Sequence, residues 1–168
     1  YVCDEQADWY PDMDDIRKKI TDRTKAIVII NPNNPTGVIY TEDTIRALAA
    51  VLNEKAKEYG EPCYLVSDEP YRELAYDGVK VPFLPAFYDH TIIGYSWSKS
   101  LSLPGERIGY LAISPRAYEA DLIVSAATIA NRIIGFVNAP SLMQKAVAKC
   151  LDCQTDISAY DKNRRCCQ

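Results

Sequence analysis

Short apolar runs alternate along this chain with stretches in which apolar residues recur every three or four positions. The runs are rich in β-branched residues and predict strands over residues 25–30, 63–67, 91–95 and 107–113. The first run has no polar alternation, which predicts a strand buried on both faces. Helical spacing predicts helices around residues 13–20, 41–60 and 142–150. This strand–helix–strand order predicts an α/β fold, with a mostly parallel sheet flanked by helices.

The middle helix has the clearest boundaries. Thr41 is a typical N-cap, and Gly60 is placed where a helix commonly ends. Between them, apolar residues recur at helical spacing and form one buried stripe: Ile45, Leu48, Ala49, Leu52 and Ala56. With 168 residues the chain is long enough for one domain with a sizeable core.

Three polar clusters follow the first three predicted strands. Residues 31–37 read Asn-Pro-Asn-Asn-Pro-Thr-Gly, residues 67–71 read Ser-Asp-Glu-Pro-Tyr, and residues 96–109 contain a lysine and an arginine. Asn34 follows the first strand, Asp68 ends the second, and Ser96 and Lys99 end the third. Because ligands of such sheets gather at the carboxyl ends of the strands, we expect these groups to line one site.

The chemistry of these groups suits an aromatic aldehyde phosphate. A lysine in a desolvated site, here Lys99, can form an imine with an aldehyde. Asp68 can hold a pyridine nitrogen protonated, while Tyr71 and Asn34 can bind a phenolate oxygen. Taken alone, Asp68 is equally consistent with a helix cap or a surface turn.

A phosphate group would be bound by the last cluster. The guanidinium of Arg107 offers a planar pair of donors, and Ser96 and Ser98 add hydroxyl donors. Taken alone, a lysine between serines is typical of an exposed loop, so the interpretation depends on all three clusters together.

Composition limits the partners and the cellular location to be expected. The net charge is −4 and there is no long apolar run, so neither nucleic acid nor a membrane is an expected partner. The N-terminus does not resemble a signal peptide, which predicts a cytoplasmic protein whose six cysteines are free thiols. Cys63 is expected to pack within a strand. The other candidate, a metal site made of Cys150, Cys153 and the Cys166–Cys167 pair, is disfavoured.

Two enzyme classes are also disfavoured. No Gly-X-Gly-X-X-Gly follows a strand, as a dinucleotide-binding fold would require. The single histidine, His90, has no Gly-X-Ser-X-Gly motif to accompany it, as a serine hydrolase of the α/β class would require.

The three motifs together resemble those of class I/II aminotransferases, which belong to the fold-type I pyridoxal-phosphate enzymes. In this resemblance Asn34 and Tyr71 contact the phenolate oxygen of pyridoxal 5′-phosphate, and Asp68 contacts its pyridine nitrogen. Lys99 matches the Schiff-base lysine. The positions that match the phosphate-binding residues are Ser96, Ser98 and Arg107.

The resemblance also implies an organisation and a reaction. Residues 1–168 would form part of the large, pyridoxal-phosphate-binding domain, with the small domain and the N-terminal part absent. The parent enzyme, expected to be a homodimer, would transfer an amino group between an amino acid and a 2-oxo acid, with Lys99 as general base and acid.

Several alternatives share the same residues. Carbon–sulfur lyases, decarboxylases and aminocyclopropane-carboxylate synthases use the same cofactor and the same pattern. The isolated chain could also be a folded piece without turnover. The motifs do not identify the amino-acid substrate.

Overall fold

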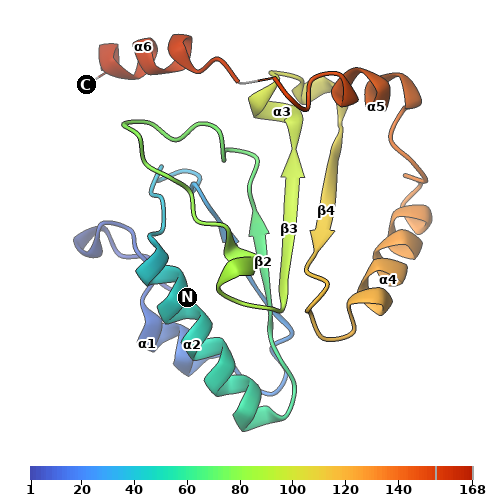
Figure 1. Cartoon of the computed structure of the whole chain (residues 1–168). Coiled ribbons are helices and arrows are strands. Elements are labelled where there is room, and N and C mark those ends of the chain that lie inside the picture. Colours follow the sequence, from blue (N-terminus) through green and yellow to red (C-terminus); the bar gives the residue numbers. More distant parts are fainter. Residues whose placement is uncertain (154, 168) are drawn as a thin grey trace.

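A sheet of four strands forms the centre of this computed structural model, which describes residues 1–153 and 155–167 (Figure 1). The strands are β1 (Ala26–Ile30), β2 (Tyr64–Asp68), β3 (Thr91–Ser96) and β4 (Gly109–Ile113), and they lie side by side in chain order. The first three are parallel, whereas β4 runs antiparallel to β3. The predicted α/β fold with a mostly parallel sheet is therefore confirmed.

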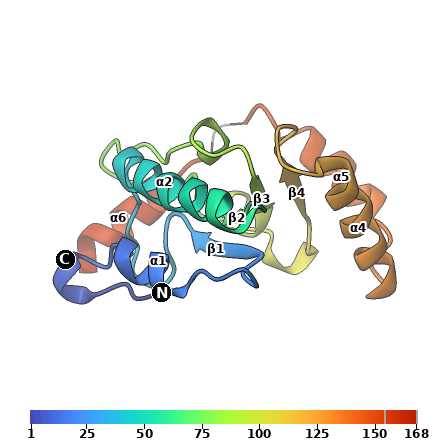
Figure 2. The same cartoon turned by 90° about the horizontal axis from the view of Figure 1, so that it is seen from below.

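The helices are arranged around this sheet. Their bounds are η1 (Glu5–Ala7), α1 (Met13–Lys19), α2 (Glu42–Tyr59), η2 (Leu84–Ala86), α3 (Trp97–Ser100), η3 (Pro104–Glu106), α4 (Ala120–Ile133), α5 (Ser141–Ala148) and α6 (Ser158–Cys167). Seen from below, α1 and α2 lie towards β1, while α4 and α5 lie beyond β4 (Figure 2). No helix in the part of the chain that the structure describes is long and apolar enough to cross a membrane.

The predicted middle helix is confirmed as α2, together with both of its ends. The Thr41 side chain accepts a hydrogen bond from the Thr44 amide, as an N-cap should. Gly60 follows the last turn with φ of 78°, a left-handed conformation that glycine adopts without a Cβ penalty.

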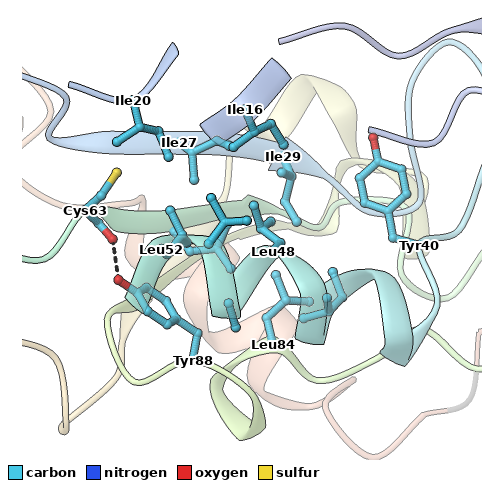
Figure 3. Close-up of a cluster of buried hydrophobic side chains, with 14 residues drawn as sticks. Ile16, Ile20, Ile27, Ile29, Tyr40, Leu48, Leu52, Cys63, Leu84 and Tyr88 are labelled. Carbon is cyan, nitrogen blue, oxygen red and sulfur yellow. Dashed lines mark hydrogen bonds between the residues drawn. The ribbon is translucent and has the colours of Figure 1, made fainter. Parts of the chain in front are cut away.

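The hydrophobic core lies between α1, α2 and one face of β1 and β2 (Figure 3). Its fully buried members include Leu48 and Leu52 of α2 and Leu65 of β2. The segment before β3 closes the core, where the Tyr88 hydroxyl donates to the Cys63 carbonyl at 2.7 Å. Cys63 itself is 3% exposed and so is packed as expected, but it directly precedes β2 and does not lie within the strand.

The prediction that the first strand is buried on both faces is wrong. Exposure alternates along β1, with Ile27 and Ile29 buried and Val28 57% exposed. The buried face packs in the core with α1 and α2, and no described residue gives the other face comparable cover. A continuous apolar run shows that both faces of a strand could be buried, but not that other elements pack against both of them.

The C-terminal part differs most from the predicted elements. Helix α4 was not predicted, although apolar residues recur along it at helical spacing. It begins without a side-chain cap, and large apolar residues such as Leu122, Ile129 and Ile133 are exposed. The predicted helix over 142–150 ends at Ala148, so Cys150 lies outside α5. Helix α6 was also missed.

Candidate active site

The polar clusters lie at one edge of the sheet because the parallel strands end there together. Ile30 pairs with Asp68, and Asp68 pairs with Gly94 close to the end of β3. The segments that follow β1, β2 and β3 therefore all begin at this edge. Helix α3, which carries Lys99, lies directly above the end of β3 (Figure 1).

Three predicted site residues, one from each segment, come together at this edge. The amide Nδ2 of Asn34 donates to the Tyr71 hydroxyl at 3.0 Å. The Lys99 Nζ lies over the Tyr71 ring, 5.6 Å from its centroid, within the range of a cation–π interaction. An amide, a phenol and an amine that are far apart in sequence therefore share one small region.

The segment after β1 is folded by its own asparagines. Asn31 is fully buried, and its Oδ1 accepts from the Tyr40 amide at 2.9 Å. The Asn33 Oδ1 accepts from the Thr36 hydroxyl at 2.9 Å, which closes the turn. These bonds anchor both ends of the segment and leave Asn34 exposed at its tip, where it reaches Tyr71.

Asp68 is the last residue of β2, beside Gly94 of β3. Its Oδ1 faces the space next to that glycine, since a Cβ built on Gly94 would lie 4.0 Å from it. Partial burial raises the pKa of Asp68 above its usual value, because desolvation disfavours the charged form. Such a carboxylate gains stability when a cation or a positively charged ring comes near.

The proposed phosphate-binding residues lie in or beside the connection from β3 to β4. Ser96 ends β3, and Ser98 lies in α3 together with Lys99. Arg107 follows η3 in a left-handed conformation, with φ of 50°, and its Nη1 donates to the Pro104 carbonyl at 2.6 Å. The structure shows these residues in the same connection but no hydrogen bond from any of them to Asn34, Tyr71 or Lys99 within the described residues.

Glu69 and Arg72, which the sequence did not single out, fix the backbone on both sides of Tyr71. Glu69 is 2% exposed and accepts from Ser67 Oγ at 2.9 Å and from Arg72 Nη1 at 2.7 Å. Arg72 also donates to the carbonyls of Val81 and Pro82. The i,i+3 spacing of an acid and an arginine around the tyrosine was the available signal, although such pairs are usually exposed.

Sequence comparison identifies the family. The sequence model described as "Aminotransferase class I and II" matches residues 1–167. The chain belongs to this family. The glutamate-pyruvate aminotransferase of Escherichia coli K12 is 34% identical over 153 residues, which are 88% of this chain and 36% of that protein. A probable aspartate/prephenate aminotransferase of Thermus aquaticus is 44% identical over 107 residues, 64% of this chain and 26% of that protein.

Solved aminotransferase structures have the same fold. A crystal structure of an aminotransferase from Eubacterium rectale superposes with a TM-score of 0.93 at 44% identity, covering 98% of this chain and 41% of that one. The aspartate aminotransferase of Thermus thermophilus, solved with maleate, gives 0.73 at 30% identity, covering 96% and 39%. The chain thus spans about two fifths of the length of these members of the family.

Proposed function

We propose that this chain forms the pyridoxal-5′-phosphate-binding part of an enzyme that transfers an amino group between an amino acid and a 2-oxo acid. The observation that carries the proposal is the convergence of Asn34, Tyr71 and Lys99 at the carboxyl edge of the sheet. The names of its relatives, which include glutamate-pyruvate, alanine and aspartate aminotransferases, support the reaction class.

The groups present fit this cofactor. The amine of Lys99 is suited to the aldehyde, and the Tyr71 hydroxyl with the Asn34 amide to the phenolate oxygen. Asp68 is suited to the pyridine nitrogen, since its raised pKa reflects a carboxylate short of compensating charge. Serine hydroxyls and a guanidinium, from Ser96, Ser98 and Arg107, are proposed to bind the phosphate.

When bound, the cofactor supplies an electron sink for the negative charge that forms at the substrate Cα. Lys99 Nζ then acts as general base and removes the Cα proton. Asp68 keeps the ring nitrogen protonated, while the Tyr71 hydroxyl donates to the phenolate oxygen and Asn34 Nδ2 holds that hydroxyl or the oxygen itself. Lys99 and Asp68 therefore act at the substrate Cα and the ring nitrogen, whereas Tyr71 and Asn34 act together at the phenolate oxygen.

The proposal extends to organisation. We propose that residues 1–168 are part of a large cofactor-binding domain, that the rest of the substrate site comes from segments outside this chain, and that the enzyme is a cytoplasmic homodimer. The share of about two fifths that the chain covers in its relatives supports such a division.

A cofactor-trapping experiment tests the proposal. The chain is mixed with pyridoxal 5′-phosphate, its near-visible absorbance is recorded, and the adduct is reduced with borohydride and located by mass spectrometry. We expect the label on Lys99, its loss in Lys99→Ala, and no change in Lys80→Ala, which alters an exposed lysine in the loop after Gly78. Labelling that spreads equally over surface lysines would overturn the proposal.

Product analysis of the full-length parent enzyme then separates amino-group transfer from other chemistry on the same cofactor. Alanine, glutamate and aspartate are each supplied with a 2-oxo acid, and the products are identified. Formation of a new amino acid together with a new 2-oxo acid is expected. Release of ammonia with pyruvate, or of carbon dioxide, would instead identify a lyase or a decarboxylase.

A further inference from the structure

The hydroxyl of Tyr95 joins two segments of the candidate site. Tyr95 lies on β3, and its hydroxyl donates to Glu73 Oε1 at 2.9 Å. The same hydroxyl is 2.8 Å from Ser100 Oγ. Because a phenol carries one proton, which Glu73 receives, the serine must be the donor in the second bond. The result is an ordered chain from Ser100 through Tyr95 to Glu73.

The two ends of this bridge are close in sequence to Tyr71 and Lys99. Glu73 is two residues beyond Tyr71 in the segment after β2, and Ser100 directly follows Lys99 in α3. These two segments follow different strands, so their relative position is not set by the local backbone. The bridge connects them through side chains only.

The ring of Tyr95 is held in place by two aromatic neighbours. It stacks on Tyr110 with a centroid separation of 5.3 Å and meets Trp97 edge-on at 5.5 Å. Burial raises the pKa of Tyr95 to about 12, so the hydroxyl keeps its proton at neutral pH. The geometry therefore presents a fixed, protonated donor to Glu73.

Glu73 depends on this donor. Its second oxygen, Oε2, is buried and has no hydrogen-bond partner among the residues that the structure describes. The Tyr95 hydroxyl is the one donor that the described residues offer to the carboxyl group. Loss of that hydroxyl would leave the carboxyl group without a partner, which is strongly unfavourable when the group is removed from water.

We propose that Tyr95 is a positioning residue, whose bridge between Glu73 and Ser100 sets the position of Lys99 relative to Tyr71. Its effect on catalysis rests on the proposed function, whereas its effect on the two segments does not. Tyr95→Phe removes both hydrogen bonds and keeps the stacked ring. Tyr110→Phe is the matched control, since the Tyr110 hydroxyl makes no hydrogen bond to a described residue.

Hydrogen exchange of the cofactor-free chain is the first test. In Tyr95→Phe, peptides over residues 71–75 and 97–101 should exchange about tenfold faster, as expected for the loss of two hydrogen bonds from a local opening unit. Peptides from α2 should be unchanged, which excludes global loosening, and Tyr110→Phe should match the parent. Equal exchange in Tyr95→Phe and Tyr110→Phe would overturn the proposal. If Tyr95→Phe does not fold, Ser100→Ala cuts one arm, and exchange over 97–101 decides.

Adduct formation is the second test. The rate at which pyridoxal 5′-phosphate forms the reducible adduct on Lys99 should fall about tenfold in Tyr95→Phe and stay constant in Tyr110→Phe. Faster exchange with an unchanged adduct rate would show a merely structural bridge and overturn the positioning role. If neither the parent nor any variant forms an adduct, the proposed function fails. The hydrogen-exchange result then decides by itself whether the bridge orders residues 71–75 and 97–101.

Discussion

Replacing Arg72 by methionine should destabilise the chain strongly, because it leaves the buried carboxylate of Glu69 without its cationic partner. Arg72 Nη1 lies 2.7 Å from Glu69 Oε2, and the Glu69 side chain is 2% exposed. Methionine keeps much of the apolar stem but removes the guanidinium that donates to Glu69 and to the carbonyls of Val81 and Pro82. The Ser67 hydroxyl would remain as a donor to the acid.

The expected loss follows from the burial of the pair. Removing one partner of a buried ion pair typically costs about 3–5 kcal/mol. The remaining bond from Ser67 and the 29% exposure of the Arg72 side chain place the expected loss near the lower end, about 3 kcal/mol. With a urea m-value of about 2 kcal/mol/M, typical of small proteins, the denaturation midpoint should fall by about 1.5 M.

Urea denaturation followed by circular dichroism measures this shift. Lys25→Met is the matched control: it breaks the exposed Lys25–Glu61 pair, and its midpoint should stay within experimental error. Adding Glu69→Gln to Arg72→Met removes the stranded charge and should restore most of the loss. If Arg72→Met behaves like Lys25→Met, or if the second change does not restore stability, the buried-charge argument is refuted.

Three further changes address backbone packing and pH. Gly109→Ala would place a Cβ against the Tyr95 carbonyl oxygen, and the clash should cost about 1–3 kcal/mol in thermal or urea denaturation. Asp68→Asn should stabilise the cofactor-free chain, and the gain should be larger at pH 7 than at pH 4, because burial raises the pKa of Asp68 and penalises its charged form. The same substitution should weaken cofactor binding. Burial lowers the pKa of His90, whose Nδ1 accepts from the Tyr118 amide. The unfolded chain therefore binds a proton before the folded chain does, and stability should start to fall once the pH drops below about 6.5, the ordinary histidine value. His90→Asn should flatten the melting temperature over that range.

Each of these has an outcome that would contradict it. Gly105→Ala is the control for the glycine, since a Cβ there meets nothing within 4 Å; equal losses at both glycines would exclude the clash. An Asp68→Asn variant no more stable than the parent at pH 7 would show that the carboxylate is not strained by burial. For His90, a parent and variant that melt in parallel from pH 7 to 5 would exclude the histidine, even though Asp89 nearby opposes the shift.

The strands and α2 could be predicted because local chemistry determines them. β-Branched runs and the Thr41 and Gly60 caps act within a few residues, so the tertiary context did not change them. Which face of β1 is covered could not be predicted, because the answer depends on where α1 and α2 pack. Helix α4 has apolar residues at helical spacing but no side-chain cap at its start, so its N-terminal boundary had no local signal.

The candidate site was predictable as far as it depends on strand ends. Asn34, Tyr71 and Lys99 follow three neighbouring strands, and the parallel sheet brings them together. The supporting contacts of Glu69 and Tyr95 depend on side-chain rotamers between distant segments, which spacing does not reveal. The roles of Ser96, Ser98 and Arg107 in phosphate binding stay predictions.

The reversal of direction at β4 constrains how this region can vary in length. Ser96 pairs with Gly109, so the two ends of the connection over residues 97–108 are held together by the hydrogen bonds between β3 and β4. Insertions or deletions in this connection would change the position of the Lys99 amine relative to the Arg107 guanidinium. Extra residues in the exposed turn after Gly60 would not. We therefore expect laboratory libraries of loop-length variants to tolerate change at that turn and to lose cofactor capture when the 97–108 loop is lengthened.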